Sequence, residues 1–175
     1  VQYLKADDPS ELFAEADRVR KERMGDSIHL RGLIEFSNAC GRDCHYCGIR
    51  KSNKNVFRYR MDIEEIFQTA RQACEIGYKS LVLQSGENCQ YKIEDLCVLL
   101  SRIKKDLDIA ITLSIGEKTR EEYAALKNVG ADRFLLRFET SNEALFARLK
   151  PDSSYLARMK CLDLLRELRF QVGSG

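Results

Sequence analysis

The sequence lacks the features of secreted, membrane-bound and nucleic-acid-binding proteins. Its net charge is only +2 over 175 residues, because 29 lysines and arginines nearly balance 27 aspartates and glutamates. So small an excess gives no reason to expect a nucleic acid or a membrane surface as partner. No apolar run is long enough to cross a bilayer, and no basic and apolar leader opens the chain. We therefore expect a cytoplasmic globular protein without nucleic-acid or membrane partners.

Cysteine, in contrast, is well represented. There are seven cysteines, an odd number, and nothing else suggests secretion, so a disulfide framework is not expected. Cys40, Cys44 and Cys47 form a C-x3-C-x2-C pattern directly after an apolar run. Three thiolates on a short loop can bind three irons of a cubane iron–sulfur cluster and leave the fourth iron without a protein ligand. An open coordination position is typical of a reactive metal centre.

A zinc site is the alternative interpretation of this loop. His45 lies within it, but it is adjacent to Cys44 and poorly placed to complete a tetrahedron with it. A closed site of this kind would make the protein a non-enzymatic metal-binding module. Three cysteines outside the loop fall on apolar helical stripes and are predicted to be small core residues: Cys74, Cys97 and Cys161.

The order of predicted elements indicates an α/β fold. Residues 1–26 are predicted to be an N-terminal helical segment, whose apolar residues have the spacing of a buried stripe: Leu12, Phe13, Ala16 and Val19. From residue 27 to residue 175 strands alternate with helices, which predicts a parallel sheet. A complete eightfold barrel needs about 250 residues, so we expect only the first part of a (βα) TIM-type barrel, roughly four and a half units, truncated in the fifth strand.

Polar residues follow each predicted strand. Active sites of parallel barrels gather at the carboxyl ends of the strands, so these residues are expected to share one rim. A charge beside an apolar strand needs a partner, and on this ground Glu87, Arg137 and Glu139 are predicted to be functional. Glu117 is predicted to serve only helix capping or loop solvation. Cys89 is expected on the same rim, and the sequence leaves open whether its thiol is reactive.

The cysteine loop, residues 38–50, resembles the signature of the radical S-adenosylmethionine (SAM) enzymes. From about Ser27 onward the chain is more specifically similar to the FeFe-hydrogenase maturase family HydE. The matching stretches include Ile34-Glu35-Phe36-Ser37-Asn38, Arg58-Tyr59-Arg60-Met61, Leu83-Gln84-Ser85-Gly86-Glu87, Leu135-Leu136-Arg137-Phe138-Glu139-Thr140 and Lys150-Pro151-Asp152. Radical SAM enzymes of the biotin synthase or methylornithine synthase type have similar loops and remain the alternative.

The resemblance implies an enzyme that uses a 4Fe-4S cluster with one open iron together with SAM. Cys40, Cys44 and Cys47 would bind the cluster. SAM would chelate the open iron, and an electron from the reduced cluster would split its sulfur–C5′ bond to give a 5′-deoxyadenosyl radical.

The resemblance also assigns a residue to each group of SAM. Gly86 and Glu87 match the segment at the methionine ammonium, and Glu139 matches the position that accepts from the ribose. Arg158 matches the arginine that holds the carboxylate, for which a guanidinium fork is suited. Tyr46 matches the position beside adenine, although a packing role competes for it.

Finally, likeness to HydE implies a role in maturation of the hydrogenase H-cluster, on a small-molecule or organometallic cysteine-derived substrate. Four residues match positions of that family's substrate cavity: Arg31, Gln84, Thr112 and Arg137. A surface charge at a strand edge is an equal alternative for Arg31. The expected partners are an electron donor such as flavodoxin or ferredoxin and other hydrogenase maturases.

Overall fold

The computed structural model describes residues 7–87 and 91–175. The chain divides into two compact units, Val1–Leu30 and Arg31–Gly175. In the first unit, α1 (Ser10–Met24) buries none of its residues, and Phe13 is 64% exposed. The prediction of a buried stripe on this helix is therefore wrong. Charged residues occur on all of its sides, and it is supported by ion pairs within the helix, such as those of Arg18 with Glu15 and Glu22.

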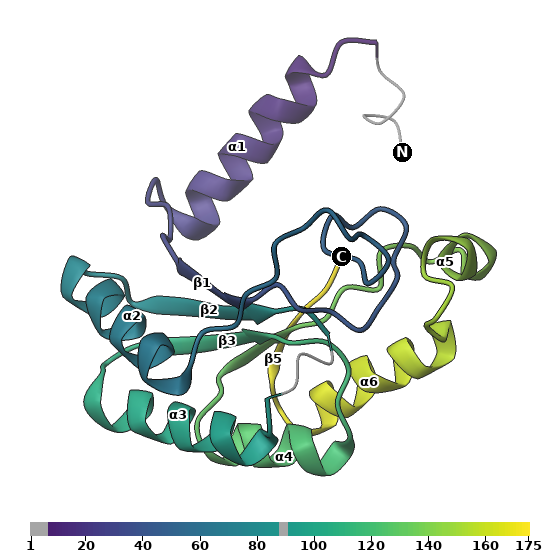
Figure 1. Cartoon of the computed structure of the whole chain (residues 1–175). Coiled ribbons are helices and arrows are strands. Elements are labelled where there is room, and N and C mark those ends of the chain that lie inside the picture. Colours follow the sequence, from purple (N-terminus) through teal and green to yellow (C-terminus); the bar gives the residue numbers. More distant parts are fainter. Residues whose placement is uncertain (1–6, 88–90) are drawn as a thin grey trace. The chain divides into compact units, whose positions relative to one another are not determined.

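One parallel sheet organises the second unit. Its strands are β1 (Gly32–Ser37), β2 (Ser80–Ser85), β3 (Ala110–Ser114), β4 (Arg133–Leu135) and β5 (Gln171–Gly173). They pair in the order of the chain, and every pair is parallel. Figure 1 shows the helices returning the chain from each strand to the next. The predicted α/β class, with strands and helices in alternation, is confirmed.

The helices of this unit are α2 (Ile63–Ile76), α3 (Ile93–Asp106), α4 (Arg120–Asn128), α5 (Glu143–Leu149) and α6 (Tyr155–Glu167). Two of them begin with a capping box, formed by Asp62 with Glu65 at α2 and by Thr119 with Glu122 at α4. Gly77 ends α2 in the left-handed conformation, with φ of 107°. No helix within the described residues is long and apolar enough to cross a membrane.

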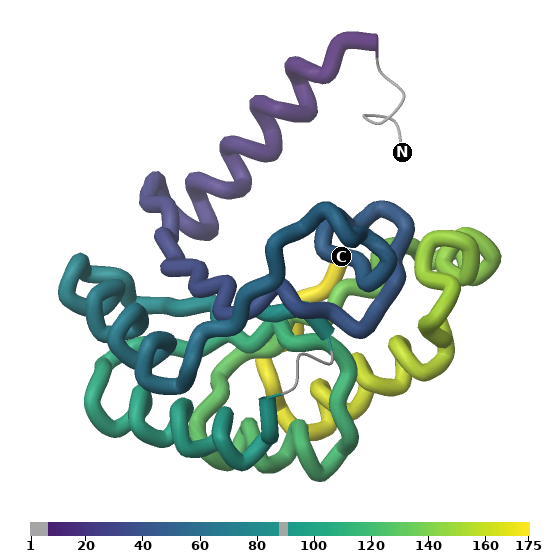
Figure 2. Tube along the Cα trace, viewed as in Figure 1, coloured from purple at the N-terminus to yellow at the C-terminus, as the bar shows by residue number. Residues whose placement is uncertain are grey.

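The core lies between the sheet and the helices α2, α3, α4 and α6, which cover one of its faces (Figure 1). On β1, Ile34 and Phe36 are buried, whereas Leu33 and Glu35, which alternate with them, are exposed, as the period of two in a strand requires. The carboxyl ends of the strands, in contrast, carry polar residues such as Asn38, Gln84 and Ser114. Figure 2 shows the blue segment with the cysteine loop lying next to the carboxyl ends of the strands and near α5. Those ends therefore carry the site.

The predicted core cysteines are also found where expected. Cys161 is buried in the core, and Cys74 and Cys97 are half-buried and packed against it. β1 begins at Gly32, which lies opposite Leu81 of β2 in the ladder.

Candidate active site

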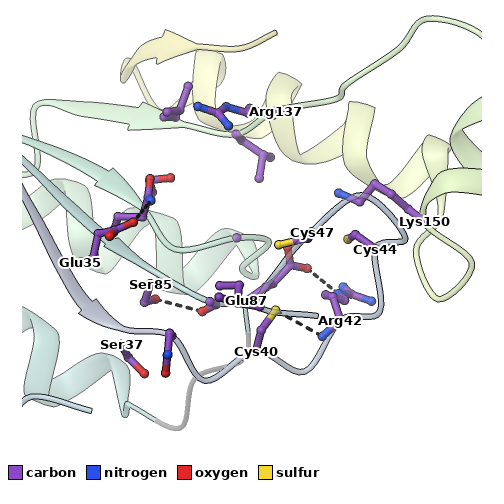
Figure 3. A pocket seen from close by; sticks show the side chains of 18 of the residues that line it. Glu35, Ser37, Cys40, Arg42, Cys44, Cys47, Ser85, Glu87, Arg137 and Lys150 are labelled. Carbon is purple, nitrogen blue, oxygen red and sulfur yellow. Dashed lines mark hydrogen bonds and ion pairs between the residues drawn. The ribbon is translucent and has the colours of Figure 1, made fainter. Parts of the chain in front are cut away.

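A cavity of about 410 Å³ opens at the carboxyl ends of the strands, a volume within the usual range for small-molecule sites. Cys40, Cys44 and Cys47 all line it, and all three are free thiols that are half-buried. Figure 3 shows them on one side of the cavity, with Glu35 and Arg137 on the opposite side. The cavity therefore brings together residues that lie about a hundred positions apart in the sequence.

Backbone hydrogen bonds connect the end of β2 to the start of the cysteine loop. Gly41 donates a backbone hydrogen bond to the Glu87 carbonyl at 2.8 Å, and Gly86 donates one to the Ser37 carbonyl at 3.1 Å. A Cβ atom at Gly86 would lie 2.1 Å from the Ala39 carbonyl oxygen. Only glycine leaves room for the loop backbone at this distance. The position predicted for SAM binding thus also has a packing requirement.

A second anchor comes from the corner between α5 and α6. The His45 amide donates to the Leu149 carbonyl at 2.9 Å, and the Asp43 amide donates to Asp152 Oδ2 at 3.0 Å. Arg42 Nη1 donates to the Asp152 carbonyl at 2.6 Å. Three residues of the loop, Arg42, Asp43 and His45, are therefore bound to the turn between α5 and α6. These bonds fix the cysteine loop relative to α6.

Arg58, which belongs to one of the stretches similar to HydE, is a third anchor of the loop. Its guanidinium donates to four carbonyls of the loop, those of Asn38, Ile49, Arg50 and Asn53, at 2.6 to 3.2 Å. All four lie outside the strands and helices, and the Arg50 carbonyl also accepts from the Asn53 amide at 3.1 Å. The arginine thus supplies donors that water would otherwise have to supply. Arg58 thereby joins the start of the loop at Asn38 to its end at residues 49–53.

The donor set fits an iron–sulfur cluster. Thiolate is the ligand type of such clusters, and the Arg42 amide already donates to Cys40 Sγ at 3.4 Å, as backbone amides do to cluster sulfurs. Burial raises the pKa of the Cys44 thiol, and the charge of Lys150 opposes that rise. Within the described residues no three His, Cys, Asp or Glu side chains converge as a single-ion site. A polynuclear cluster does not need convergence, because each thiol binds its own iron.

Behind the loop, four side chains form a closed set of alternating charges, here called the four-charge network: Arg42, Glu87, Glu117 and Arg158. Arg42 Nε lies 2.6 Å from Glu87 Oε1 and its Nη2 lies 3.0 Å from Glu117 Oε2. Arg158 Nη2 lies 3.1 Å from Glu87 Oε2 and its Nε lies 2.9 Å from Glu117 Oε1. The network joins the cysteine loop, the ends of β2 and β3, and α6.

Glu117 corrects a prediction. It was assigned to helix capping or loop solvation, but its side chain is only 16% exposed and bridges two arginines. Burial alone would raise the pKa of Glu87, and Arg158 and Arg42 together reverse this and lower it. Gly116, with φ of 76°, makes the arrangement possible, since a Cβ there would lie 2.2 Å from Glu87 Cγ.

Arg158 is placed to accept a further partner. Its side chain is 3% exposed, and it lines the cavity. Although Nε faces Glu117, that N–H forms no hydrogen bond within the described part of the chain. Glu117 Oε1 at 2.9 Å still compensates its charge, and because Arg158 lines the cavity, its guanidinium can also interact with an incoming oxygen ligand.

Tyr46 and Glu139 lie together on the cavity wall. Burial and the neighbouring charges of Cys44 and Glu139 raise the pKa of the Tyr46 phenol, which is therefore a neutral hydrogen-bond donor. Glu139 has φ of 68°, in the left-handed region, and its amide donates to the Gly175 carbonyl at 2.8 Å. Such a conformation in a residue other than glycine is uncommon and often marks functional positions.

The predicted site residues separate into two groups. Ten line the cavity: Cys40, Cys44, Tyr46, Cys47, Gln84, Gly86, Glu87, Arg137, Glu139 and Arg158. The other two do not. Arg31 is exposed just before β1, and Thr112 is buried within β3. Cys89 lies outside the described residues.

Several wall residues were not predicted from the sequence. They are Glu35, whose Oε1 accepts from Gln84 Nε2 at 2.9 Å, together with Arg42 and Lys150. Glu35 could have been found by its outward position on a strand with a period of two. Nothing in the local pattern marks Arg42 or Lys150, since their partners lie far away in the sequence.

Comparison with known proteins gives one consistent result. Residues 34–175 match the model of the radical SAM superfamily. The chain is 48% identical over 164 residues to the FeFe hydrogenase maturase subunit HydE of Thermotoga maritima, covering 94% of this chain and 47% of the relative. It is 31% identical over 170 residues to a biotin synthase of Clostridium perfringens, covering 94% and 53%. The chain spans about half the length of these curated relatives.

Solved structures agree on the fold. A crystal structure of methylornithine synthase (PylB) superposes with a TM-score of 0.92 at 24% identity and covers 99% of this chain and 53% of its own. At that identity the likeness concerns the fold alone. A crystal structure of HydG, a maturase of the FeFe-hydrogenase, superposes with a TM-score of 0.87 at 26% identity and covers 99% and 41%.

Proposed function

The chain belongs to the radical SAM superfamily, and from this premise we propose that it binds a 4Fe-4S cluster and reductively cleaves SAM. One observation carries the proposal: the three free thiols of the cysteine loop line the same cavity as Arg158, Glu139 and Tyr46. When bound, the cluster supplies the electron that splits the sulfur–C5′ bond of SAM and yields a 5′-deoxyadenosyl radical. The protein supplies orientation and exclusion of water.

The four-charge network explains how the amino acid part of SAM is held. Its carboxylate binds the guanidinium of Arg158, which lines the cavity, and its ammonium binds Glu87. A zwitterion brings one charge of each sign. It therefore enters a network of two arginines and two glutamates without leaving a net buried charge.

The nucleoside part is assigned to the opposite wall. Glu139 accepts from the ribose hydroxyls, and the ring of Tyr46 lies against adenine, while its neutral phenol is hydrogen-bonded to Glu139 and Cys44. No side chain has to transfer a proton in the cleavage step. The wall residues therefore act by binding and orientation alone.

The substrate belongs to the same proposal. Identity of 48% to a HydE, against 31% to a biotin synthase, supports a role in hydrogenase H-cluster maturation over the biotin synthase or methylornithine synthase type. Arg137 and Gln84 are on the wall opposite the cysteines, where the arginine can bind the carboxylate of a cysteine-derived substrate. The electron comes from a cytoplasmic donor of the flavodoxin or ferredoxin type.

The proposal is tested by anaerobic reconstitution with iron and sulfide, followed by reduction and electron paramagnetic resonance with and without SAM. We expect a 4Fe-4S signal that changes on addition of SAM and that is absent from Cys44→Ala. A folded sample that forms no cluster and binds one zinc tightly would overturn the proposal in favour of a metal-binding module.

A further inference from the structure

Lys150 is a buried cation for which the site described above has no role. It caps α5, in the turn from Leu149 to Asp152 that anchors the cysteine loop, and it is only 4% exposed. Its side chain lines the cavity, and Figure 3 shows it directed inward beside Cys44. The ring of Phe146 lies 5.4 Å from its Nζ.

No carboxylate of the described residues forms an ion pair with this ammonium. Glu87 and Glu117, the two largely buried acids of the four-charge network, are paired with arginines. A buried ammonium that lacks an anion is costly. The position is less favourable still because Arg158 brings a like charge near it, and burial together with Arg158 lowers the pKa of Lys150.

Cys44 lines the same cavity as Lys150, and Figure 3 shows the two side chains next to each other, so a cluster bound at Cys44 would bring an anionic group to the ammonium. A cluster held by three thiolates carries net negative charge, and reduction adds one more. A fixed cation in a low dielectric stabilises the more negative state.

We propose that Lys150 is a positioning charge for the cluster, which stabilises the anionic cluster at Cys44 and favours its reduced state. The electron itself comes from an external low-potential one-electron donor, and no bond of Lys150 is made or broken. This inference rests on the proposed function, because it requires a cluster at the three cysteines.

The test is a potentiometric titration of the reconstituted whole chain without SAM, followed by electron paramagnetic resonance. Lys150→Met is expected to have a lower midpoint potential than the unmodified chain, and Lys150→Arg a nearly unchanged one. Lys160→Met is the matched control, since Lys160 is exposed on α6. If circular dichroism shows that Lys150→Met does not fold, Lys150→Gln, which keeps a polar tip without charge, replaces it in the same comparison.

Equal potentials in the neutral variant and the unmodified chain would overturn the inference, and so would a fall in Lys150→Arg as large as that in Lys150→Met. Unchanged potentials with weaker SAM binding would assign Lys150 to the SAM carboxylate instead. If the unmodified chain forms no cluster, the proposed function fails and this inference with it. An unchanged potential in a chain that does bind the cluster overturns this inference alone.

Discussion

Removing Arg42 should destabilise the protein far more than removing an exposed arginine. Arg42→Met leaves Glu87 and Glu117 with Arg158 as their one remaining ion-pair partner in the described part of the chain. It also removes the donor to the Asp152 carbonyl at 2.6 Å. One net negative charge then remains behind the cysteine loop, and the loop loses a connection to α6.

The size of the effect follows from burial. The side chains of Arg42, Glu87 and Glu117 are 20%, 11% and 16% exposed. Breaking a fully buried pair costs about 3–5 kcal/mol, and partial access of water to Arg42 reduces this to roughly 3 kcal/mol. For a chain of this size that corresponds to a fall in melting temperature of roughly 6–12 °C.

Thermal unfolding followed by circular dichroism at pH 7 measures this difference. The matched control is Arg120→Met, because the Arg120–Glu167 pair is exposed and should contribute less than about 1 kcal/mol. In the double variant Arg42→Met/Glu117→Gln the second change should remove part of the unpaired charge, so the two effects should be less than additive by more than about 0.5 kcal/mol. Equal losses in Arg42→Met and Arg120→Met, or full additivity in the double variant, would refute the reasoning.

Three further predictions follow from the contacts of the site. Gly86→Ala should displace the cysteine loop, since its Cβ would lie 2.1 Å from the Ala39 carbonyl oxygen; iron analysis should find less cluster per chain than in Gly48→Ala, whose Cβ meets nothing within 4 Å. The pKa of Glu87 is lowered on folding, so its contribution to stability is complete above about pH 4.5 and is lost as the pH falls through the folded value; melting temperature should fall less steeply with acid in Glu87→Gln, and an identical slope would contradict this. Arg58→Met should remove the guanidinium donor from four carbonyls of residues 38–53 and should increase amide hydrogen exchange there, whereas unchanged exchange would show that Arg58 does not organise this segment.

Local patterns in the sequence were enough to predict most of the fold. The capping boxes at Asp62 and Thr119 and the stop at Gly77 depend on residues within one helical turn, so they can be read without tertiary information. The cysteine spacing and the polar strand ends are local as well. Their convergence at one rim follows from the parallel sheet, because the carboxyl ends of parallel strands meet at one edge.

The remaining features depend on distant partners. Glu117 has the sequence context of a loop residue before a helix, and its bond to Arg42 spans 75 positions. The apolar spacing of α1 resembled a buried stripe, but the charges around the helix leave no apolar face. Lys150 follows a short helix like any surface lysine, yet it is buried, and the cysteine loop that binds the neighbouring Leu149 carbonyl lies far away in the sequence.

The central claim is that the open iron of the cluster and SAM meet in this cavity. Electron–nuclear double resonance on the reduced, reconstituted chain tests it most directly, with SAM labelled with ¹⁵N at the amino group and ¹⁷O at the carboxylate. We predict hyperfine couplings from both labels, weakened or lost in Arg158→Met. A reduced 4Fe-4S cluster that shows no coupling to either label at saturating SAM would contradict the account.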